Sequence, residues 1–482
     1  MATVAMRPAR SGRLTELLLM IPALALGLYA YVQVGLAIDG APPARLTTYA
    51  LAFTVLAILT HIIVRWRAPY ADPVILPIAM ALNGIGLAMI ARLDLAYEAQ
   101  GSASHRFATG QMQWTVLGIV LCLAVVLLLK DHRTLRRFTY LSLVGGLILL
   151  LMPLLPVLGK TINGSRIWIG LGPFSFQPAE IAKILLAIFF AGYLAAERDN
   201  LALAGSRILG LQLPRLRHFG PICLAWAVAV LVLVFEKDLG TSLLFFGLFV
   251  AMLYVATERT SWIVIGLTMF SGAVIVAGSM FSHVYARYEI WRDPLSAELY
   301  SRSPGGSYQL VQGMFGMAQG GLMGTGWGYG HPELVYAAHS DSITASLGEE
   351  LGLTGLFAIL MLYLILALRG IRVGLSIRDA FGKLLCGGLA FVIAFQVFVV
   401  VGGITRVIPL TGLTLPFLAQ GGSSLGANWM IVGLLLRMSN GARQPGNATG
   451  RAPSPQVVDG PVPPRIGDLS DDAHATEEVR LT

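Results

Sequence analysis

Long apolar runs separated by short polar stretches dominate the chain from Leu14 almost to its end. Most runs are close to the roughly 20 residues that an α-helix needs to cross the hydrocarbon core of a bilayer. Because that core leaves backbone polar groups without water, we expect the runs to be helical. The pattern predicts an all-α integral membrane protein, a polytopic bundle of about twelve transmembrane helices. The predicted spans are 14–36, 47–64, 74–91, 113–129, 138–156, 179–195, 220–235, 240–256, 262–281, 343–368, 381–401 and 421–436.

Composition supports this prediction. Of the 482 residues 56% are hydrophobic and 12% are charged, whereas a soluble domain is about 45–50% apolar and about 25% charged. The three cysteines all lie inside apolar runs, which favours packing over a disulfide framework or a metal site. The first run, from Leu14 to Ile38, is too long for a cleaved signal peptide and is expected to remain as the first span.

The distribution of basic residues predicts the topology. The net charge is +8, but Lys and Arg are scattered through short loops and not gathered on one soluble face, which argues against a nucleic-acid partner. The positive-inside rule places both termini in the cytoplasm. The expected organisation is a cytoplasmic N-terminus (1–13), a membrane domain (14–438) with a long extracytoplasmic loop (282–342), and a disordered cytoplasmic tail (439–482).

Polar, glycine and aromatic residues collect in the predicted outer segments. In 163–183, Arg166 and Lys183 are candidate donors to a phosphate-bearing lipid. The alternative is an interfacial loop with a local Glu180–Lys183 pair. In 236–241, three charges occupy a tight turn beside the membrane, where charge is costly unless it is paired, wetted or functional. A short solvated turn is the simpler explanation of that segment.

The loop 282–342 is too long for a simple connector. Its glycines, from Gly320 to Gly330, lack the Lys-Ser/Thr and the preceding strand of a nucleotide-binding loop. They suit close backbone approach or flexibility. His339 beside Asp341 is weak evidence for a metal site. A further segment, 409–424, is apolar but broken by prolines, so we expect it to lie inside protein or along a wet cavity.

Six motifs in order carry a resemblance to a known family. They are Asn-Gly-x-x-x-Trp-Ile-x-Leu-Gly-Pro-Phe-Ser-Phe-Gln-Pro (163–178), Asp-Leu-Gly-Thr (238–241), Trp-x-Asp-Pro (291–294), Tyr-Gln-Leu (308–310), His-x-Asp with Gly-Glu-Glu-Leu-Gly (339–352), and Pro-x-Thr-Gly-x-x-Leu-Pro-Phe with Gly-Gly-Ser-Ser (409–424). The chain resembles the SEDS family of bacterial envelope proteins, which includes RodA and FtsW, and is most similar to actinobacterial RodA-like members. The resemblance covers about 138–438, and it implies a ten-helix core with about two additional N-terminal helices.

The resemblance implies a peptidoglycan glycosyltransferase that polymerises lipid II at the outer face of the bacterial cytoplasmic membrane. It also implies a class B penicillin-binding protein as partner, together with other elongation or division machinery. Mg²⁺ or Mn²⁺ is the implied ion. The catalytic carboxylate of the family corresponds to Asp293. The chain departs from the family pattern after Pro294, where about a dozen residues precede Tyr308.

The implied chemistry suits these residues. Asp293 can accept the proton of the attacking sugar hydroxyl as general base, and pyrophosphate leaves without an acid, so one step inverts the anomeric centre. An Asp-Pro turn is the ordinary alternative for Asp293. The candidate cations for the departing pyrophosphate are Arg166, Lys183, Arg292 and Arg406. Arg292 has the alternative role of neutralising Asp293, and Arg406 that of anchoring a helix end. Further candidates for substrate contact are Asp238, Gln309, His339, Asp341, Glu349 and Ser423.

Two other functions remain open at this stage. A lipid II flippase would also use broken helices and charges within the membrane, although the unusual residues gather on the predicted outer half. A non-enzymatic recruiter of a penicillin-binding protein would use the same motifs as a docking surface. Only the glycosyltransferase requires Asp293 for glycan synthesis.

Overall fold

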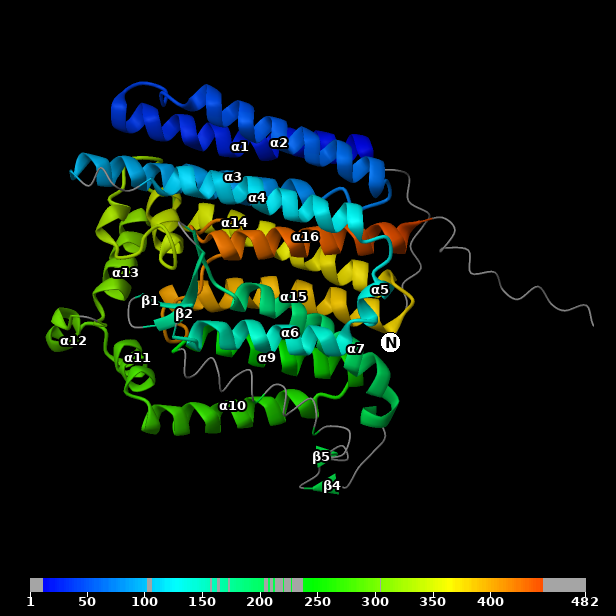
Figure 1. The fold of residues 1–482 in the computed structure, drawn as a ribbon. Coiled ribbons are helices and arrows are strands. Elements are labelled where there is room, and N and C mark those ends of the chain that lie inside the picture. Colours follow the sequence, from blue (N-terminus) through cyan, green and yellow to red (C-terminus); the bar gives the residue numbers. More distant parts are fainter. Residues whose placement is uncertain are drawn as a thin grey trace, which may run out of the picture.

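The computed structural model is a bundle of long, roughly antiparallel helices (Figure 1). It describes residues 12–101, 106–156, 158–162, 165–171, 174–202, 207–208, 211–212, 220, 227, 237–303 and 305–444. The predicted span at 220–235 therefore lies outside the described residues, apart from positions 220 and 227. The predicted tail lies outside them beyond residue 444.

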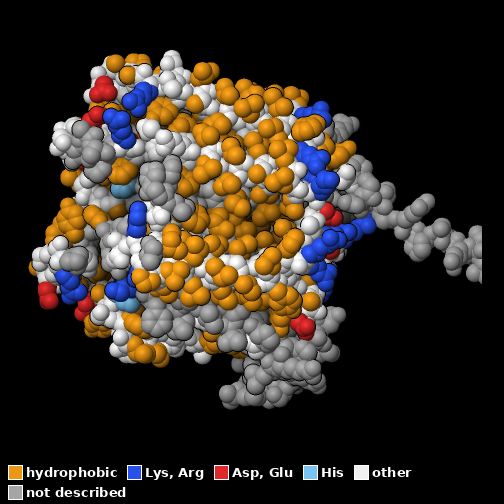
Figure 2. All heavy atoms as spheres, viewed as in Figure 1, with side chains coloured by type: hydrophobic (Ala, Val, Ile, Leu, Met, Phe, Trp, Pro, Cys, Tyr) orange, Lys and Arg blue, Asp and Glu red, His pale blue; other side chains and the backbone are white. Residues whose placement is uncertain are grey.

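Nine helices in the described part of the chain are long and apolar enough to cross a membrane. They are α1 (Arg13–Asp39), α2 (Leu46–Arg67), α3 (Ile75–Ala99), α4 (Phe107–Leu128), α7 (Ala179–Ala202), α9 (Leu239–Thr257), α10 (Ser261–Met280), α14 (Ile343–Ser376) and α15 (Ala380–Ile404). Two predicted spans appear as a shorter apolar helix, α6 (Thr139–Leu151) with η1 (Met152–Leu154), and as α16 (Gly422–Arg443). The prediction of a helical membrane protein is confirmed. Figure 2 shows hydrophobic side chains covering the middle of the molecule, with Lys and Arg towards the ends.

The helices pack in pairs that build the core. α1 packs on α3, α4 on α16, α14 on α15, and α6 on α7. At the crossing of α1 and α3, a Cβ on Gly27 would lie 2.8 Å from Cα of Gly84, so the two glycines permit the close approach of these helices. α1 and α2 form a hairpin on one side of the bundle (Figure 1).

One end of the bundle, here called the loop end, carries most of the irregular structure (Figure 1). It includes α11 (Ser282–Arg292), α12 (Ala297–Ser301), α13 (Tyr308–Gly320) and η2 (Pro332–Leu334). It also includes an antiparallel sheet of β1 (Gly159–Ile162), β2 (Ser165–Leu171) and β3 (Phe174–Phe176), in which Ile169 pairs with both Gly159 and Phe176. The all-α prediction missed this sheet. The remaining short elements are α5 (Arg133–Arg136), β4 (Arg207–Ile208) and β5 (Leu211–Gln212).

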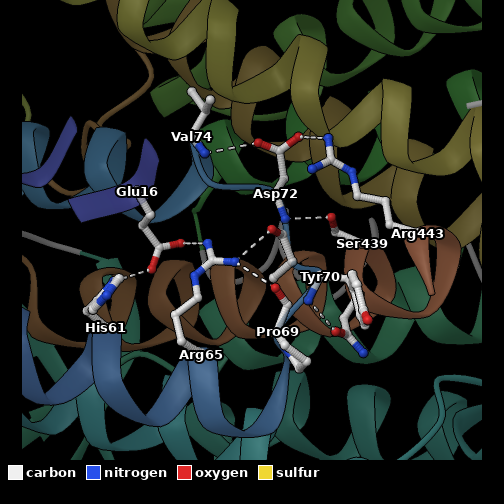
Figure 3. Close-up of polar contacts among 11 residues, drawn as sticks. Glu16, His61, Arg65, Pro69, Tyr70, Asp72, Val74, Ser439 and Arg443 are labelled. Carbon is white, nitrogen blue, oxygen red and sulfur yellow. Dashed lines mark hydrogen bonds and ion pairs between the residues drawn. The ribbon is translucent and has the colours of Figure 1, made fainter. Parts of the chain in front are cut away.

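Buried ion pairs tie the hairpin together at the opposite end of the bundle (Figure 3). Glu16 on α1 is fully buried and pairs with Arg65 on α2, and it also contacts Nδ1 of His61 at 2.8 Å. Arg65 donates further to the carbonyls of Pro69 and Ala71. The guanidinium thus joins both helices of the hairpin to the turn that leads into α3.

The C-terminal end of α16 belongs to the same region, which corrects the predicted start of the tail at residue 439 (Figure 3). Ser439 accepts a hydrogen bond from the backbone N–H of Asp72 at 2.8 Å, and Arg443 pairs with the carboxylate of Asp72 at 2.6 Å. Asn440 accepts from the N–H of Tyr70. These contacts explain why a stretch of polar composition continues the helix to Arg443.

Candidate functional site

Asp293 lies at the loop end, as the first residue beyond the C-terminus of α11. Its backbone N–H donates to the carbonyl of Glu289 at 2.9 Å, while its φ of −139° and ψ of 71° leave the helix. The side chain is exposed. Within the part of the chain that the structure describes, no side chain pairs with its carboxylate. A ligand can therefore reach this group without displacing a protein partner.

Arg406 contacts the end of α11. Its guanidinium donates from Nε to the carbonyl of Trp291 at 2.9 Å and from Nη2 to the carbonyl of Arg292 at 3.0 Å. The indole Nε1 of Trp291 donates back to the carbonyl of Arg406 at 3.1 Å. Arg406 was predicted either to bind pyrophosphate or to anchor a helix end, and the structure places it at a helix end. Arg292 is exposed beside Asp293.

Arg287 joins α11 to two acidic residues from other parts of the chain. Its guanidinium donates to the carbonyl of Leu410 and interacts electrostatically with Asp238 and Asp341. Burial lowers the pKa of Arg287, and the two carboxylates oppose that shift. On α11, Arg287 and Trp291 are four residues apart and so share a face, which contacts the 406–410 segment.

Asp238 caps the N-terminus of α9. Its carboxylate accepts from the N–H of Thr241 at 2.9 Å and from the Thr241 hydroxyl at 2.6 Å. Burial raises the pKa of Asp238, while the Thr241 hydrogen bonds and Arg287 lower it. Gln177 reaches the same carboxylate at 3.4 Å, and its backbone N–H donates to the hydroxyl of Ser423 at 2.9 Å. Two predicted site residues, Asp238 and Ser423, are thus linked through Gln177.

Asp341 lies just before the N-terminus of α14 and is hydrogen-bonded to Gln309 on α13. The side-chain amide of Gln309 donates to Asp341 at 3.1 Å and to the hydroxyl of Ser342 at 2.8 Å. Burial raises the pKa of Asp341, and the hydrogen bonds from Gln309 and Ser340 together with Arg287 lower it. The ring of His339 points elsewhere and stacks on Phe107 with centroids 4.1 Å apart.

Lys183 and Arg166 occupy separate environments. Lys183 is 1% exposed, and its Nζ lies 2.5 Å from Oε2 of Glu180 and 3.1 Å from the side-chain oxygen of Gln396. Gln396 in turn donates to the carbonyl of Thr414, in the non-helical segment between α15 and α16. Arg166 on β2 donates from Nη2 to the carbonyl of Leu155, and its Nε is buried without a hydrogen-bond partner among the described residues.

Glu349 and Glu350 hold the glycine segment, residues 321–331. The carboxylate of Glu349 accepts from the N–H of His331 at 2.6 Å, and that of Glu350 accepts from Gly328 at 3.1 Å. Arg92 on α3 pairs with Glu350 at 2.8 Å and donates to the carbonyl of Gly330 at 2.7 Å. The carboxylate of Glu349, which was predicted to contact substrate, is therefore hydrogen-bonded to the backbone of the glycine segment.

The same segment crosses an interruption in α14. Gly352 has φ 66° and ψ −173°, which breaks the helix. The carbonyls of Glu349 and Glu350 accept from the backbone N–H groups of 325 and 326, while the N–H groups of 353 and 354 donate to the carbonyls of 321 and 322. The predicted interruption at 409–424 is also present, since 405–421 is non-helical and its central residues are buried.

Metal-ligating side chains do not gather in this region. Across the described residues, no group of three or more His, Cys, Asp or Glu side chains could hold an ion. Asp238 and Asp341 instead interact electrostatically with a common cation, Arg287. The residues present therefore do not fit a protein-built cage for Mg²⁺ or Mn²⁺.

Sequence reasoning missed several residues that connect the site. Gln177 lies within the first quoted motif. Arg287 lies before the Trp-x-Asp-Pro motif, and its four-residue spacing from Trp291 is the one signal that could have singled it out. Arg92 directly follows the predicted span 74–91, and a charge at the edge of an apolar span is a similar signal. Their partners lie far away in sequence: Gln177 is 246 residues from Ser423, and Arg92 is 258 from Glu350.

Comparison with known proteins decides the family. The family model FtsW/RodA/SpoVE, described as "Cell cycle protein", matches residues 73–444. The chain belongs to the FtsW/RodA/SpoVE family. The predicted resemblance is thereby confirmed. The match includes α3 and α4 and leaves the α1–α2 hairpin outside, while every predicted site residue falls within it.

Named relatives of the family align with most of the chain. The peptidoglycan glycosyltransferase RodA of Mycobacterium tuberculosis strain H37Rv is 47% identical over 454 residues, covering 94% of this chain and 96% of that protein. The protein of the same name from Mycobacterium leprae is 46% identical, covering 86% and 87%. Stage V sporulation protein E of Bacillus subtilis is 33% identical, covering 77% and 98%.

Two solved structures share the fold. One comes from work described as "Structural coordination of polymerization and crosslinking by a peptidoglycan synthase complex", with a TM-score of 0.60 and 24% identity, covering 77% of this chain and 98% of that one. The other is a variant of the rod shape determining protein RodA of Thermus thermophilus, with a TM-score of 0.53 and 23% identity, covering 77% and 97%. At these identities the likeness shows the fold of the family core.

Proposed function

We propose that this chain is an inverting peptidoglycan glycosyltransferase that polymerises lipid II into glycan strands. The observation that carries the proposal is the 47% identity, over 94% of the chain, to proteins named peptidoglycan glycosyltransferase RodA. The exposed, unpaired carboxylate of Asp293 at the loop end supports it, because a general base must be accessible to its substrate.

Asp293 acts as the general base in this proposal. It accepts the proton of the acceptor's sugar hydroxyl while the oxygen attacks the anomeric carbon of the donor, and polyprenyl pyrophosphate leaves from the opposite face. Pyrophosphate is a good leaving group, so no second carboxyl acting as an acid is required, in contrast to glycosidases. A single displacement inverts the anomeric centre.

Cationic side chains at the loop end stabilise the negative charge that develops on the leaving group. Arg292 is exposed beside Asp293, and the Nε of Arg166 is buried with no hydrogen-bond partner among the described residues. Lys183 is already paired with Glu180, so its contribution requires that pair to rearrange. Arg287, Asp238, Gln309, Asp341 and Ser423 organise the backbone around the site. Because the residues offer no ion cage, no step is assigned to Mg²⁺ or Mn²⁺.

We place the loop end on the outer face of the bacterial cytoplasmic membrane, with both termini in the cytoplasm. The support is the positive-inside rule applied to the short loops. In this orientation Asp293 meets lipid II after its translocation. Arg65, Arg443 and the ion pairs of Figure 3 then lie at the cytoplasmic end.

We also propose a class B penicillin-binding protein as the partner that cross-links the new strand. The support is the family resemblance, together with the shared fold of a chain solved in work on a peptidoglycan synthase complex. Further elongation or division proteins would join that assembly.

The decisive experiment incubates purified full-length protein, with its partner, with fluorescent lipid II and resolves the glycan products on gels. Wild type should form polymer, and Asp293→Asn should form none within the assay time. Glu298→Gln is the matched control, because Glu298 is an exposed carboxylate on the neighbouring helix α12. It should retain wild-type activity. Repeating the assay with EDTA, Mg²⁺ or Mn²⁺ measures the ion requirement.

Three results would contradict the proposal. Equal polymer from wild type and Asp293→Asn would exclude Asp293 as the general base. Absence of polymer with wild type would favour a non-enzymatic recruiter of a penicillin-binding protein. Transfer of labelled lipid II across liposomes without polymer would favour a flippase.

A further inference from the structure

Arg406 adopts a backbone conformation that its residue type disfavours. Its φ is 63°, in the left-handed region, where a side chain with a Cβ is strained. Such strain persists only where surrounding contacts compensate for it. At Arg406 they begin with the end of α15: Arg406 follows the C-cap Thr405, its N–H donates to the carbonyl of Gly403 at 3.3 Å, and the N–H of Val407 donates to that of Gly402 at 2.8 Å. The two hydrogen bonds from its guanidinium and the one accepted by its carbonyl add contacts with the last turn of α11.

The last carbonyls of a helix lack partners within the helix. A cationic donor at that end both satisfies them and interacts favourably with the helix dipole. Arg406 does so for Trp291 and Arg292, the two residues that immediately precede Asp293. The orientation of α11 at its end therefore depends on Arg406.

The other flank of Asp293 is also fixed. The hydroxyl of Ser307 donates to the carbonyl of Pro294 at 2.6 Å, and Ser307 is fully buried. The backbone is thus held one residue before and one residue after Asp293, while the carboxylate remains exposed. This arrangement fixes the position of the Asp293 backbone and leaves the carboxylate oxygens unoccupied.

We propose that Arg406 is a positioning residue for Asp293: its guanidinium fixes the C-terminus of α11 and thereby the place of the carboxylate. The inference rests on the proposed function and assigns Arg406 to the geometry of the base, not to contact with pyrophosphate. Ser307 holds the opposite flank in the same way.

The variant Arg406→Gly separates positioning from folding. Glycine adopts φ 63° without strain, so the melting temperature should stay within a few degrees of wild type or rise. Loss of the two hydrogen bonds should free the end of α11, and kcat should fall about tenfold to a hundredfold, as expected when a reacting group is misplaced by about 1 Å. KM for lipid II should not change, because no substrate contact is removed.

Two further variants test the contact itself. Arg406→Lys retains the positive charge but lacks the guanidinium, whose two nitrogens donate to the carbonyls of Trp291 and Arg292. Its kcat should therefore lie between those of wild type and Arg406→Gly. Trp291→Phe removes the indole donor to the Arg406 carbonyl. The loss of kcat in Trp291→Phe combined with Arg406→Gly should be smaller than the product of the single losses, because both variants disturb one contact.

The outcomes are distinguishable. If Asp293→Asn is inactive while Arg406→Gly has wild-type kcat, the positioning role is wrong and the proposed function stands. A raised KM with unchanged kcat in Arg406→Gly would make Arg406 a substrate contact and overturn the inference. If Asp293→Asn itself polymerises normally, the proposed function fails before Arg406 is considered.

Discussion

Arg92 on α3 donates from Nε to Oε1 of Glu350 on α14 over 2.8 Å, and both side chains are almost fully buried. Arg92 is also bonded to the carbonyl of Gly330, so one guanidinium joins two helices and the glycine segment. Removing one partner of such a buried pair leaves a charge without compensation.

We expect Arg92→Met to lower the free energy of unfolding by about 3–5 kcal/mol. The double variant Arg92→Met with Glu350→Gln should recover part of this loss, because it also neutralises the buried carboxylate nearest to Arg92. Thermal unfolding in detergent measures both. Equal losses in the single and double variants would contradict the assignment of the cost to the unpaired carboxylate.

The last turn of α1 lies against the glycine segment at Gly328. A Cβ on Gly328 would lie 2.7 Å from Cβ of Ala37, and the φ of Gly328 is 82°. Gly328→Ala should therefore suffer both backbone strain and a clash, and lose about 1–3 kcal/mol of stability. Gly321→Ala is the matched control: its φ is 54°, but nothing lies within 4 Å of a Cβ there.

Thermal unfolding should show a larger loss for Gly328→Ala than for Gly321→Ala. Adding Ala37→Gly to Gly328→Ala should reduce the loss to that of the control. If Ala37→Gly does not reduce the loss, the clash with α1 is not the cause of the destabilisation in Gly328→Ala.

Stability should depend on pH through Asp341. Burial raises its folded-state pKa above the usual value of about 3.9. Between these two pKa values the folded state binds more protons than the unfolded state, so its contribution to stability is present at low pH and is lost as pH rises through the raised pKa.

Asp341→Asn removes this titration. The stability of wild type relative to Asp341→Asn, measured by thermal unfolding in detergent from about pH 4 upward, should therefore decline with pH. Glu298→Gln, at an exposed position, should show no such trend. A pH-independent difference for Asp341→Asn would be inconsistent with a raised pKa.

The stability of the α1–α2 hairpin should depend on the ion pair that Glu16 makes with Arg65. Glu16→Ala leaves Arg65 buried without its carboxylate partner, and we expect a loss of about 3–5 kcal/mol in unfolding free energy. Asp39→Ala, at an exposed position at the end of the same helix, should change stability by less than about 0.5 kcal/mol. Differential thermal unfolding of the two variants tests this, and similar losses would count against the ion pair.

The motifs contain residues that the fold brings into contact with one another. Gln309 does lie against Asp341, and Asp238 does cap a helix beside Ser423 through Gln177. Hydrophobic runs predicted the helices, because crossing a bilayer imposes a length and a composition that a single sequence displays.

The features that escaped prediction depend on tertiary contacts. β1 and β3 are only four and three residues long, and the seven residues of β2, SRIWIGL, do not alternate strictly between apolar and polar types. The helical end of α16 at 439–443 requires Asp72, which is more than 360 residues away. Arg287 interacts with Asp238 and Asp341, which lie far from it in sequence and come near it only when the chain folds.

The break of α14 at Gly352 has a consequence for assembly in the membrane. The backbone bonds missing at the break are made by residues 321–326, which leave the ribosome before α14 does. In lipid those groups could not remain unpaired. The loop therefore completes the backbone hydrogen bonding of the helix, and shortening it would damage a membrane-spanning helix as well as the loop itself.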